Sequence, residues 1–300
     1  MDQLLLFSDQ VVLVNRWRTC LSQADLAGAT AVLQERLTVF PRPDGGQGQG
    51  AGLAALGEVL ELPDAARSER LAELVGSWRH EPRLGGLLPD AQALEAGLWA
   101  ALSRVLPARR TAPFRTGLWP AEVWVRVEDW PTAARLLPAS IVEHGEVAFL
   151  RQLQAWVMVR QGRLGPARAT LALALCNAAG ECRAEYLYED LSALLAEARK
   201  QLGDSPAGWQ WLTFNAWRQG LLDIPATPSP YELWLLEQTR RAPEPHDPAA
   251  RGQHFLRLLF LAEAARARGE PIGRQIELRG QMQALQPERF QEYMAEVERR

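Results

Sequence analysis

Four histidines are the side chains of this sequence best suited to bind a metal ion: His80, His144, His246 and His254. None belongs to an H-E-x-x-H or E-x-x-H pattern, in which the ligands share one helix face. His246 and Asp247 are adjacent and could bind a metal together. However, Pro248 follows, and an aspartate before a proline is typical of a helix start, where the carboxylate accepts backbone N–H groups. We therefore predict no metal site and no cofactor.

Two glutamates and two cysteines are the next candidates for chemistry. Glu185 and Glu189 are one helical turn apart, so they could bind a cation or raise each other's pKa, although a solvated helix face is the favoured explanation. Cys176 and Cys182 are spaced more widely than the C-x-x-C of redox and zinc sites, and we expect them to pack as small apolar residues. The sequence has no G-x-S-x-G elbow and no phosphate-binding loop. We therefore predict no catalytic residues.

Arginines gather in the segment 104–115, which contains Arg104, Arg109, Arg110 and Arg115 around a predicted helix end. Cations are favourable at a helix C-terminus whatever the function, but arginine also binds carboxylate and phosphate groups well. We take Arg109 and Arg110 as candidates for contact with a partner. A formal net charge of −3 gives the whole molecule no general attraction to nucleic acid, which makes nucleic acid the less favoured partner.

Length and composition describe a folded protein without a membrane span. The chain has 300 residues, of which 47% are apolar, and no stretch approaches the roughly 18 apolar residues of a membrane helix. Its first residues carry Asp2 where a secretory signal would be basic, and the apolar run that follows is short. Three cysteines do not make a disulfide framework. We expect a cytoplasmic protein.

The elements that must position these residues are helices throughout. Asp64, Asp90, Ser229 and Asp247 precede segments whose apolar residues recur every three or four positions, while Gly220 and Gly269 lie where helices should end. Strand-like alternation occurs only in the segment 122–130, which is too isolated to build a sheet. We predict an all-α protein of about fourteen helices.

One stretch interrupts the helical pattern. Residues 41–52 are rich in proline and glycine and have no apolar anchor before Gly52, so we predict a flexible loop or linker there. A dinucleotide-binding turn would need a buried strand before its glycines, and none is predicted. The expected organisation is an N-terminal helical hairpin (1–40), this linker (41–52) and a helical body (53–300).

The segment 156–175 predicts two helices that fold back on each other at Gly162. Small and apolar residues follow the spacing of a helical hairpin: Ala155, Gly162, Ala167, Leu171 and Ala174. This pattern resembles the tetratricopeptide (TPR) repeat, a unit of 34 residues with two antiparallel helices. Arg151, Gln154 and Ala179 depart from the family's preferences. The second half of the pattern recurs at Ala29, Leu33 and Pro41, and a looser echo lies in 264–287. The resemblance covers about a third of the chain.

A TPR-like fold implies a stack of hairpins with an extended concave surface. In the hairpin above, the family pattern would place Gln152, Trp156, Val159 and Arg160 on that surface, although core packing would equally explain Trp156 and Val159. We therefore predict a non-catalytic helical-repeat protein that binds another protein or peptide, as bacterial adaptors, assembly factors and secretion chaperones do. The alternatives are an all-α enzyme whose site residues are scattered among its helices, or a regulator that binds nucleic acid through its arginines.

The final segment predicts a further contact surface. Phe290, Met294 and Val297 fall on one face of the last helix. This face could pair two copies of the chain, so a homodimer through the C-terminal helix is a second expectation.

Overall fold

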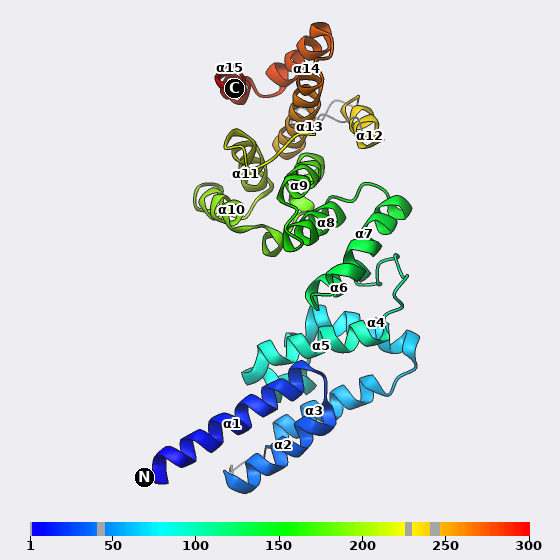
Figure 1. The fold of residues 1–300 in the computed structure, drawn as a ribbon, viewed down its shortest axis with the longest axis vertical. Coiled ribbons are helices and arrows are strands. Elements are labelled where there is room, and N and C mark those ends of the chain that lie inside the picture. Colours follow the sequence, from blue (N-terminus) through cyan, green and yellow to red (C-terminus); the bar gives the residue numbers. More distant parts are fainter. Residues whose placement is uncertain (1, 41–45, 226–229, 241–246) are drawn as a thin grey trace. The chain divides into compact units, whose positions relative to one another are not determined.

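The computed structural model describes residues 2–40, 46–225, 230–240 and 247–300. These residues form fifteen α-helices and four short 3₁₀ helices, and no strand occurs among them (Figure 1). The all-α prediction is confirmed. None of the helices in these ranges is both long and apolar enough to cross a membrane.

The chain divides into two compact units, residues 1–132 and 133–300. The division falls in the first turn of α7 (Trp130–His144), not in the segment 41–52. The predicted N-terminal hairpin is part of unit 1, because α1 (Asp2–Ser22) contacts α5 (Ala91–Val105) and α2 (Leu26–Val39) contacts α3 (Gln47–Leu60).

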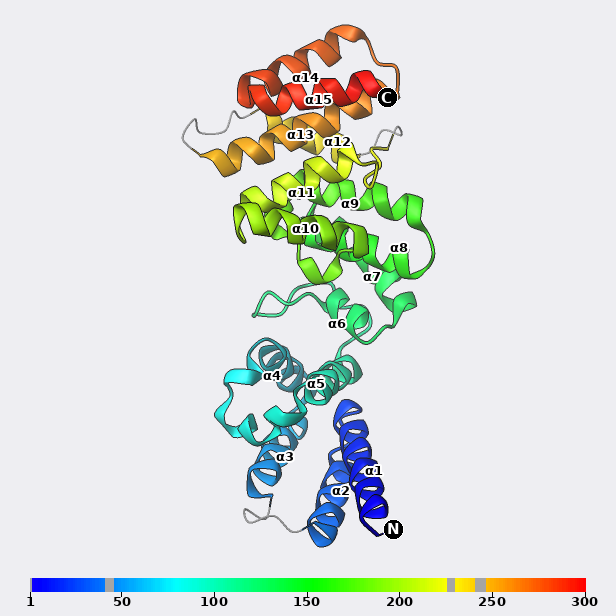
Figure 2. The ribbon, with the colours of Figure 1, turned by 90° about the vertical axis from the view of Figure 1, so that its left-hand side faces the viewer.

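Unit 1 begins with the antiparallel helices α1 and α2, which lie side by side in both views (Figures 1 and 2). Its remaining elements wrap a core around Trp17 and Leu87, which are fully buried. The elements of unit 1 are α1 (Asp2–Ser22), α2 (Leu26–Val39), α3 (Gln47–Leu60), α4 (Asp64–Ser77), η1 (Trp78–His80), η2 (Pro82–Asp90), α5 (Ala91–Val105) and α6 (Pro120–Arg126).

The second half of the predicted linker is helical. Helix α3 begins at Gln47, so residues 47–52 are not a loop, while 41–45 lie outside the described residues. The glycines there allow close packing against η2. A Cβ built at Gly86 of η2 would lie 2.1 Å from the carbonyl of Gly48, and one at Gly52 would lie 2.7 Å from the side chain of Leu87. Glycine composition alone does not distinguish a flexible segment from a closely packed one.

Two of the predicted helix starts differ in detail. Asp64 lies inside the first turn of α4, and Pro63 holds the N-cap position. Asp90 is the N-cap residue of α5, but its carboxylate makes no capping bond and instead accepts hydrogen bonds from Trp17 Nε1 (2.8 Å) and Arg18 Nε (3.0 Å). This buried carboxylate ties α1 to the start of α5.

Unit 2 is built around α13, which contacts α9, α11, α12 and α14. Its middle, from Phe255 to Ala265, is buried except at Arg257 rather than on the single predicted face, as expected for a central helix that neighbours surround. The elements of unit 2 are α7, α8 (Ala148–Arg160), α9 (Leu164–Ala178), η3 (Ala179–Glu181), η4 (Ala184–Tyr186), α10 (Glu189–Leu202), α11 (Pro206–Arg218), α12 (Pro230–Thr239), α13 (Pro248–Ala267), α14 (Ile272–Leu285) and α15 (Pro287–Arg299).

Local signals at the helix ends of unit 2 are confirmed. The Asp247 carboxylate accepts the backbone N–H of Ala250 at 2.9 Å, which caps α13. Gly220 and Gly269 adopt left-handed φ angles of 69° and 65°, each one position after the C-cap residue of α11 and α13. Ser229 and His246 lie outside the described residues.

Candidate interaction surfaces

The hairpin that carries the repeat-like pattern is formed by α8 and α9. Gly162 makes the turn with a φ of 75°, as predicted. Ala155 (3% exposed), Ala167, Leu171 and Ala174 are buried where the two helices pack. The small residues therefore allow close approach of the two helices.

Gln152 does not lie on an open groove, and this part of the predicted partner surface is wrong. Its side chain is fully buried under the segment 179–187. Gln152 Nε2 donates to the carbonyl of Arg183 at 2.7 Å, and the Arg183 N–H donates to Gln152 Oε1 at 2.8 Å. A carboxamide can satisfy both backbone groups of one residue. The partner is 31 positions away in sequence, which local patterns do not reveal.

Trp156, Val159 and Arg160 remain at the surface of α8. Trp156 and Val159 are half-buried, and Arg160 is exposed. The Arg160 guanidinium lies 4.6 Å from the centre of the Trp156 ring, and Tyr186 approaches this ring edge-on at 6.1 Å between ring centres. The tryptophan is therefore held in place by its own chain, with part of its surface open to solvent.

The arginines of the segment 104–115 have separate roles inside unit 1. Arg110 Nη2 lies 2.8 Å from Glu69 Oε1, and its guanidinium covers the Phe114 ring at 4.0 Å. Arg104 donates to the carbonyl of Gln23 at 2.6 Å. Arg110 thus fixes the loop after α5 against α4, whereas Arg109 is exposed. Arg104 and Arg110 thus contact other residues of unit 1. The arginines of this segment therefore do not form one face for an acidic partner.

The structure does not bring the glutamates and cysteines singled out in the sequence together into a catalytic or metal-binding site. Glu185 lies in η4 and Glu189 begins α10, so they do not share a helix face, and both are exposed. Cys176 and Cys182 are buried, as predicted, and burial raises the pKa of the Cys176 thiol to about 12. No group of three or more His, Cys, Asp or Glu side chains that could hold a metal ion occurs among the described residues.

A groove of about 270 Å³ lies between α3, α4 and η2 in unit 1. Its floor is apolar and its sides are charged. The floor is formed by Ala55, Val59, Leu62, Leu74 and Leu84. The sequence does not reveal this groove, because its residues come from separate elements and carry no motif.

Two ion pairs border the groove. Glu58 Oε1 lies 2.6 Å from Arg83 Nη2, and Arg70 Nη2 lies 2.8 Å from Glu81 Oε2. The hydrogen bond from Arg83 lowers the pKa of Glu58, and the same contact raises the pKa of Arg83. A hydrogen bond to Glu73 raises the pKa of Arg70. All three groups therefore keep their charge near neutral pH.

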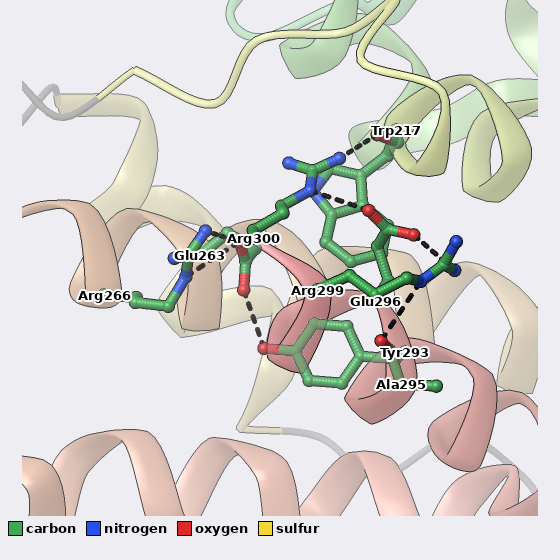
Figure 3. A network of polar contacts seen from close by, with 8 residues as sticks. All are labelled: Trp217, Glu263, Arg266, Tyr293, Ala295, Glu296, Arg299 and Arg300. Carbon is green, nitrogen blue, oxygen red and sulfur yellow. Dashed lines mark hydrogen bonds and ion pairs between the residues drawn. The ribbon is translucent and has the colours of Figure 1, made fainter.

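A buried polar network holds the last helix of unit 2 in place (Figure 3). Glu263 of α13 is 3% exposed and accepts hydrogen bonds from the Tyr293 hydroxyl (2.8 Å) and from Arg266 Nη2 (2.7 Å). Tyr293 stacks on Trp217 at 5.4 Å between ring centres. Burial, and secondly the charge of Glu263, raise the pKa of Tyr293. The hydroxyl thus stays protonated as a donor to Glu263.

The same network extends to the chain end. Glu296 pairs with Arg299 Nη2 at 2.6 Å and with Arg300 Nε at 3.1 Å, and Arg300 also donates to the carbonyl of Trp217. These contacts join α11, α13 and α15, so we assign the network a structural role.

The predicted dimer face of α15 packs against its own chain. Phe290, Met294 and Val297 are half-buried against the core of unit 2, and Phe290 approaches Tyr293 at 5.9 Å between ring centres. The large apolar side chains that stay exposed at this end of the chain belong to α14: Ile272 and Ile276.

No protein-family model matches this chain, and no curated protein or solved structure matches it either. The TPR resemblance therefore rests on the residues of the α8–α9 hairpin.

Proposed function

We propose that this protein is a non-catalytic helical-repeat protein that binds a segment of another protein, with the groove of unit 1 as its main contact site. The observation that carries this proposal is an apolar floor between two ion pairs. An apolar side chain of a partner can bury itself on the floor, while polar groups beside it exchange with the charges at the edge. Adaptors and assembly factors work by such contacts.

The electrostatics of the groove favour binding over proton transfer. A general acid or base is most effective when its pKa lies near the working pH. The paired arginines and the lowered pKa of Glu58 hold these groups in their charged forms instead. The groove therefore offers fixed charges to a partner rather than an exchangeable proton.

Trp156, Val159 and Arg160 form the second contact surface in this proposal. Tryptophan and arginine dominate binding hot spots, because they bury a large area and make directional contacts. The Arg160 guanidinium over the Trp156 ring keeps both side chains near one position, which lowers the entropy lost on binding.

Site-specific photo-crosslinking in the native host tests the proposal. A photoreactive phenylalanine analogue replaces Leu62 at the groove, Ala65 on the exposed opposite face of α4 as the matched control, or Val159 on α8. We expect a discrete adduct with one protein from position 62 and none from position 65. The adduct should disappear when Val59→Glu places a charge on the apolar floor, while circular dichroism shows an unchanged helical spectrum.

Two results would contradict the groove as the main site. Adducts of equal yield from positions 62 and 65 would show unspecific contact. A discrete adduct from position 159, without one from position 62, would move the partner site to α8.

A further inference from the structure

The edge of the groove in unit 1 carries more negative than positive charge. Arg83 pairs there with one carboxylate, that of Glu58. Arg70 instead lies between two carboxylates: its Nη1 is 3.0 Å from Glu73 Oε2, and its Nη2 is 2.8 Å from Glu81 Oε2. These contacts join three carboxylates to two guanidinium groups, which is a surplus of one negative charge.

The carboxylates at this edge keep acceptor positions for a further cation. A carboxylate has two oxygens with about four acceptor positions in all. The ion pairs engage Oε1 of Glu58 and Oε2 of both Glu73 and Glu81. The side chains of Glu58 and Glu73 are 60% and 43% exposed, so a cation can approach them from solution. A partner carboxylate, in contrast, would have to compete with these glutamates for their arginines.

The end of helix α3 favours a cation at the same place. Glu58 lies in its last turn and Glu61 is its C-cap residue, whereas the last turn contains no basic residue. Carboxylates are unfavourable at a helix C-terminus, because the macrodipole places partial negative charge there. Glu61 is exposed and directly precedes Leu62 of the groove floor. A positive group bound beside this floor would therefore be attracted by both the carboxylates and the helix end.

The floor sets the size of the apolar group that can bind. Leu74 and Leu84 form its buried part, while Val59 and Leu62 are half-buried and present apolar surface. A cavity of roughly 150 Å³ holds one benzene molecule, so a groove of about 270 Å³ accommodates one or two large apolar side chains. The stems of lysine and arginine can lie along apolar surface while their charged ends stay at its edge. Cations that neighbour an apolar anchor are therefore within reach of the glutamates.

We infer that the groove of unit 1 recognises a basic segment of its partner, in which one or two large apolar residues are flanked by lysine or arginine. The apolar residues bind the floor, and the cations bind Glu58 and the carboxylates that share Arg70. The inference rests on the proposed function and names the chemistry of the partner segment. An acidic segment is disfavoured, because its carboxylates would face like charges at the edge.

Peptide selection on the purified full chain tests this inference. A library of random peptides of about 12 residues, displayed on phage, is offered in parallel to wild type and to Val59→Glu. Val59→Glu adds a negative charge, so it would strengthen any general attraction for basic peptides and weakens binding only through the floor. We expect the peptides that prefer wild type to carry lysine or arginine within about four positions of a large apolar residue. Circular dichroism checks that the variant stays helical.

A charge removal locates the cation contact. Fluorescence anisotropy with a labelled selected peptide measures the Kd, which Glu81→Gln should raise about threefold to tenfold. Glu95→Gln is the matched control, because it removes the same charge from an ion pair with Arg79 outside the groove and should change the Kd by less than about twofold. The wild-type Kd should also rise with salt, since exposed charges are screened.

The outcomes separate this inference from the proposed function. Selected peptides without an excess of lysine and arginine, or a Kd that Glu81→Gln and Glu95→Gln change equally, would overturn the basic segment and leave the groove as a site for another kind of segment. If no peptide prefers wild type over Val59→Glu, the groove does not bind a segment at all, and the proposed function fails as well.

Discussion

The thiols of Cys176 and Cys182 lie in the core of unit 2, and burial raises the pKa of both, that of Cys176 to about 12. In the unfolded chain a thiol ionises near pH ~8.5. Between these two values the unfolded state has released the proton while the folded state keeps it, so stability decreases as pH rises. We expect the contribution of these thiols to the free energy of unfolding to be constant from pH 6 to 8 and then to fall by up to ~1.4 kcal/mol per thiol per pH unit.

Urea denaturation followed by tryptophan fluorescence at several pH values measures this slope. The Cys176→Ala/Cys182→Ala double variant is the control, and its stability should decline less steeply between pH 8.5 and 10. Equal slopes for wild type and double variant would show that these thiols do not titrate differently in the two states.

Residues whose roles depend on neighbours in sequence were predicted well, and those that depend on distant neighbours were not. Asp247 caps its helix by accepting the backbone N–H of Ala250, three residues further along the chain. Both partners of this bond lie within one short stretch of sequence, where the pattern can be recognised. Gln152 has its partner at Arg183, and Asp90 has its partners on α1. Nothing in the residues around a glutamine or an aspartate identifies such a partner, since its choice depends on the tertiary fold.

At the scale of elements, the contact between α3 and η2 is set by glycine. A Cβ at residue 86 would lie 2.1 Å from the Gly48 carbonyl group, so Gly86→Ala must push two backbones apart. We expect this variant to lose ~1–3 kcal/mol of unfolding free energy through overpacking. Urea denaturation measures the loss, with Gly85→Ala as the control because a Cβ there meets nothing within 4 Å. Equal stability of the two variants would contradict backbone contact at this crossing.

The sequence was sufficient to predict that the elements are helices. It was not sufficient to predict that the glycine-rich segment packs against another helix. Apolar residues at steps of three and four predict helices because the helix repeats every 3.6 residues. The segment 46–52 has the composition of a linker, yet Gly48 and Gly52 approach η2 closely and make it part of a packed helix pair. The residues that they pack against, 84–87 of η2, lie about 40 positions further along the chain, so the composition of the segment itself does not reveal the contact.

At the scale of the whole molecule, each unit has a hydrophobic core of its own. We therefore expect two unfolding transitions in differential scanning calorimetry. Gly86→Ala should lower the midpoint of one, and Tyr293→Phe the midpoint of the other, by ~2–8 °C each. The tyrosine variant removes the hydroxyl that donates to buried Glu263, which costs ~1–3 kcal/mol. A single transition that responds to both variants would show that the two units unfold together.

The division into two units was not visible in composition. The proline- and glycine-rich segment was the natural place for a boundary, but α1 and α5 pack together across it. The observed boundary falls within the first turn of α7, where no change in composition marks it. The groove of unit 1 is equally assembled from residues of several elements that carry no motif.

The two hydrogen bonds between the Gln152 carboxamide and the backbone of Arg183, together called the clamp, limit how these two positions can evolve. Gln152 binds only the backbone N–H and C=O of residue 183, so the clamp itself accepts any residue at 183 except proline, which lacks the N–H. Position 152 has no such freedom, because glutamate lacks the donor and leucine lacks both groups. Residue 183 can therefore change without loss of these two hydrogen bonds, whereas a change of residue 152 to glutamate or leucine removes at least one of them.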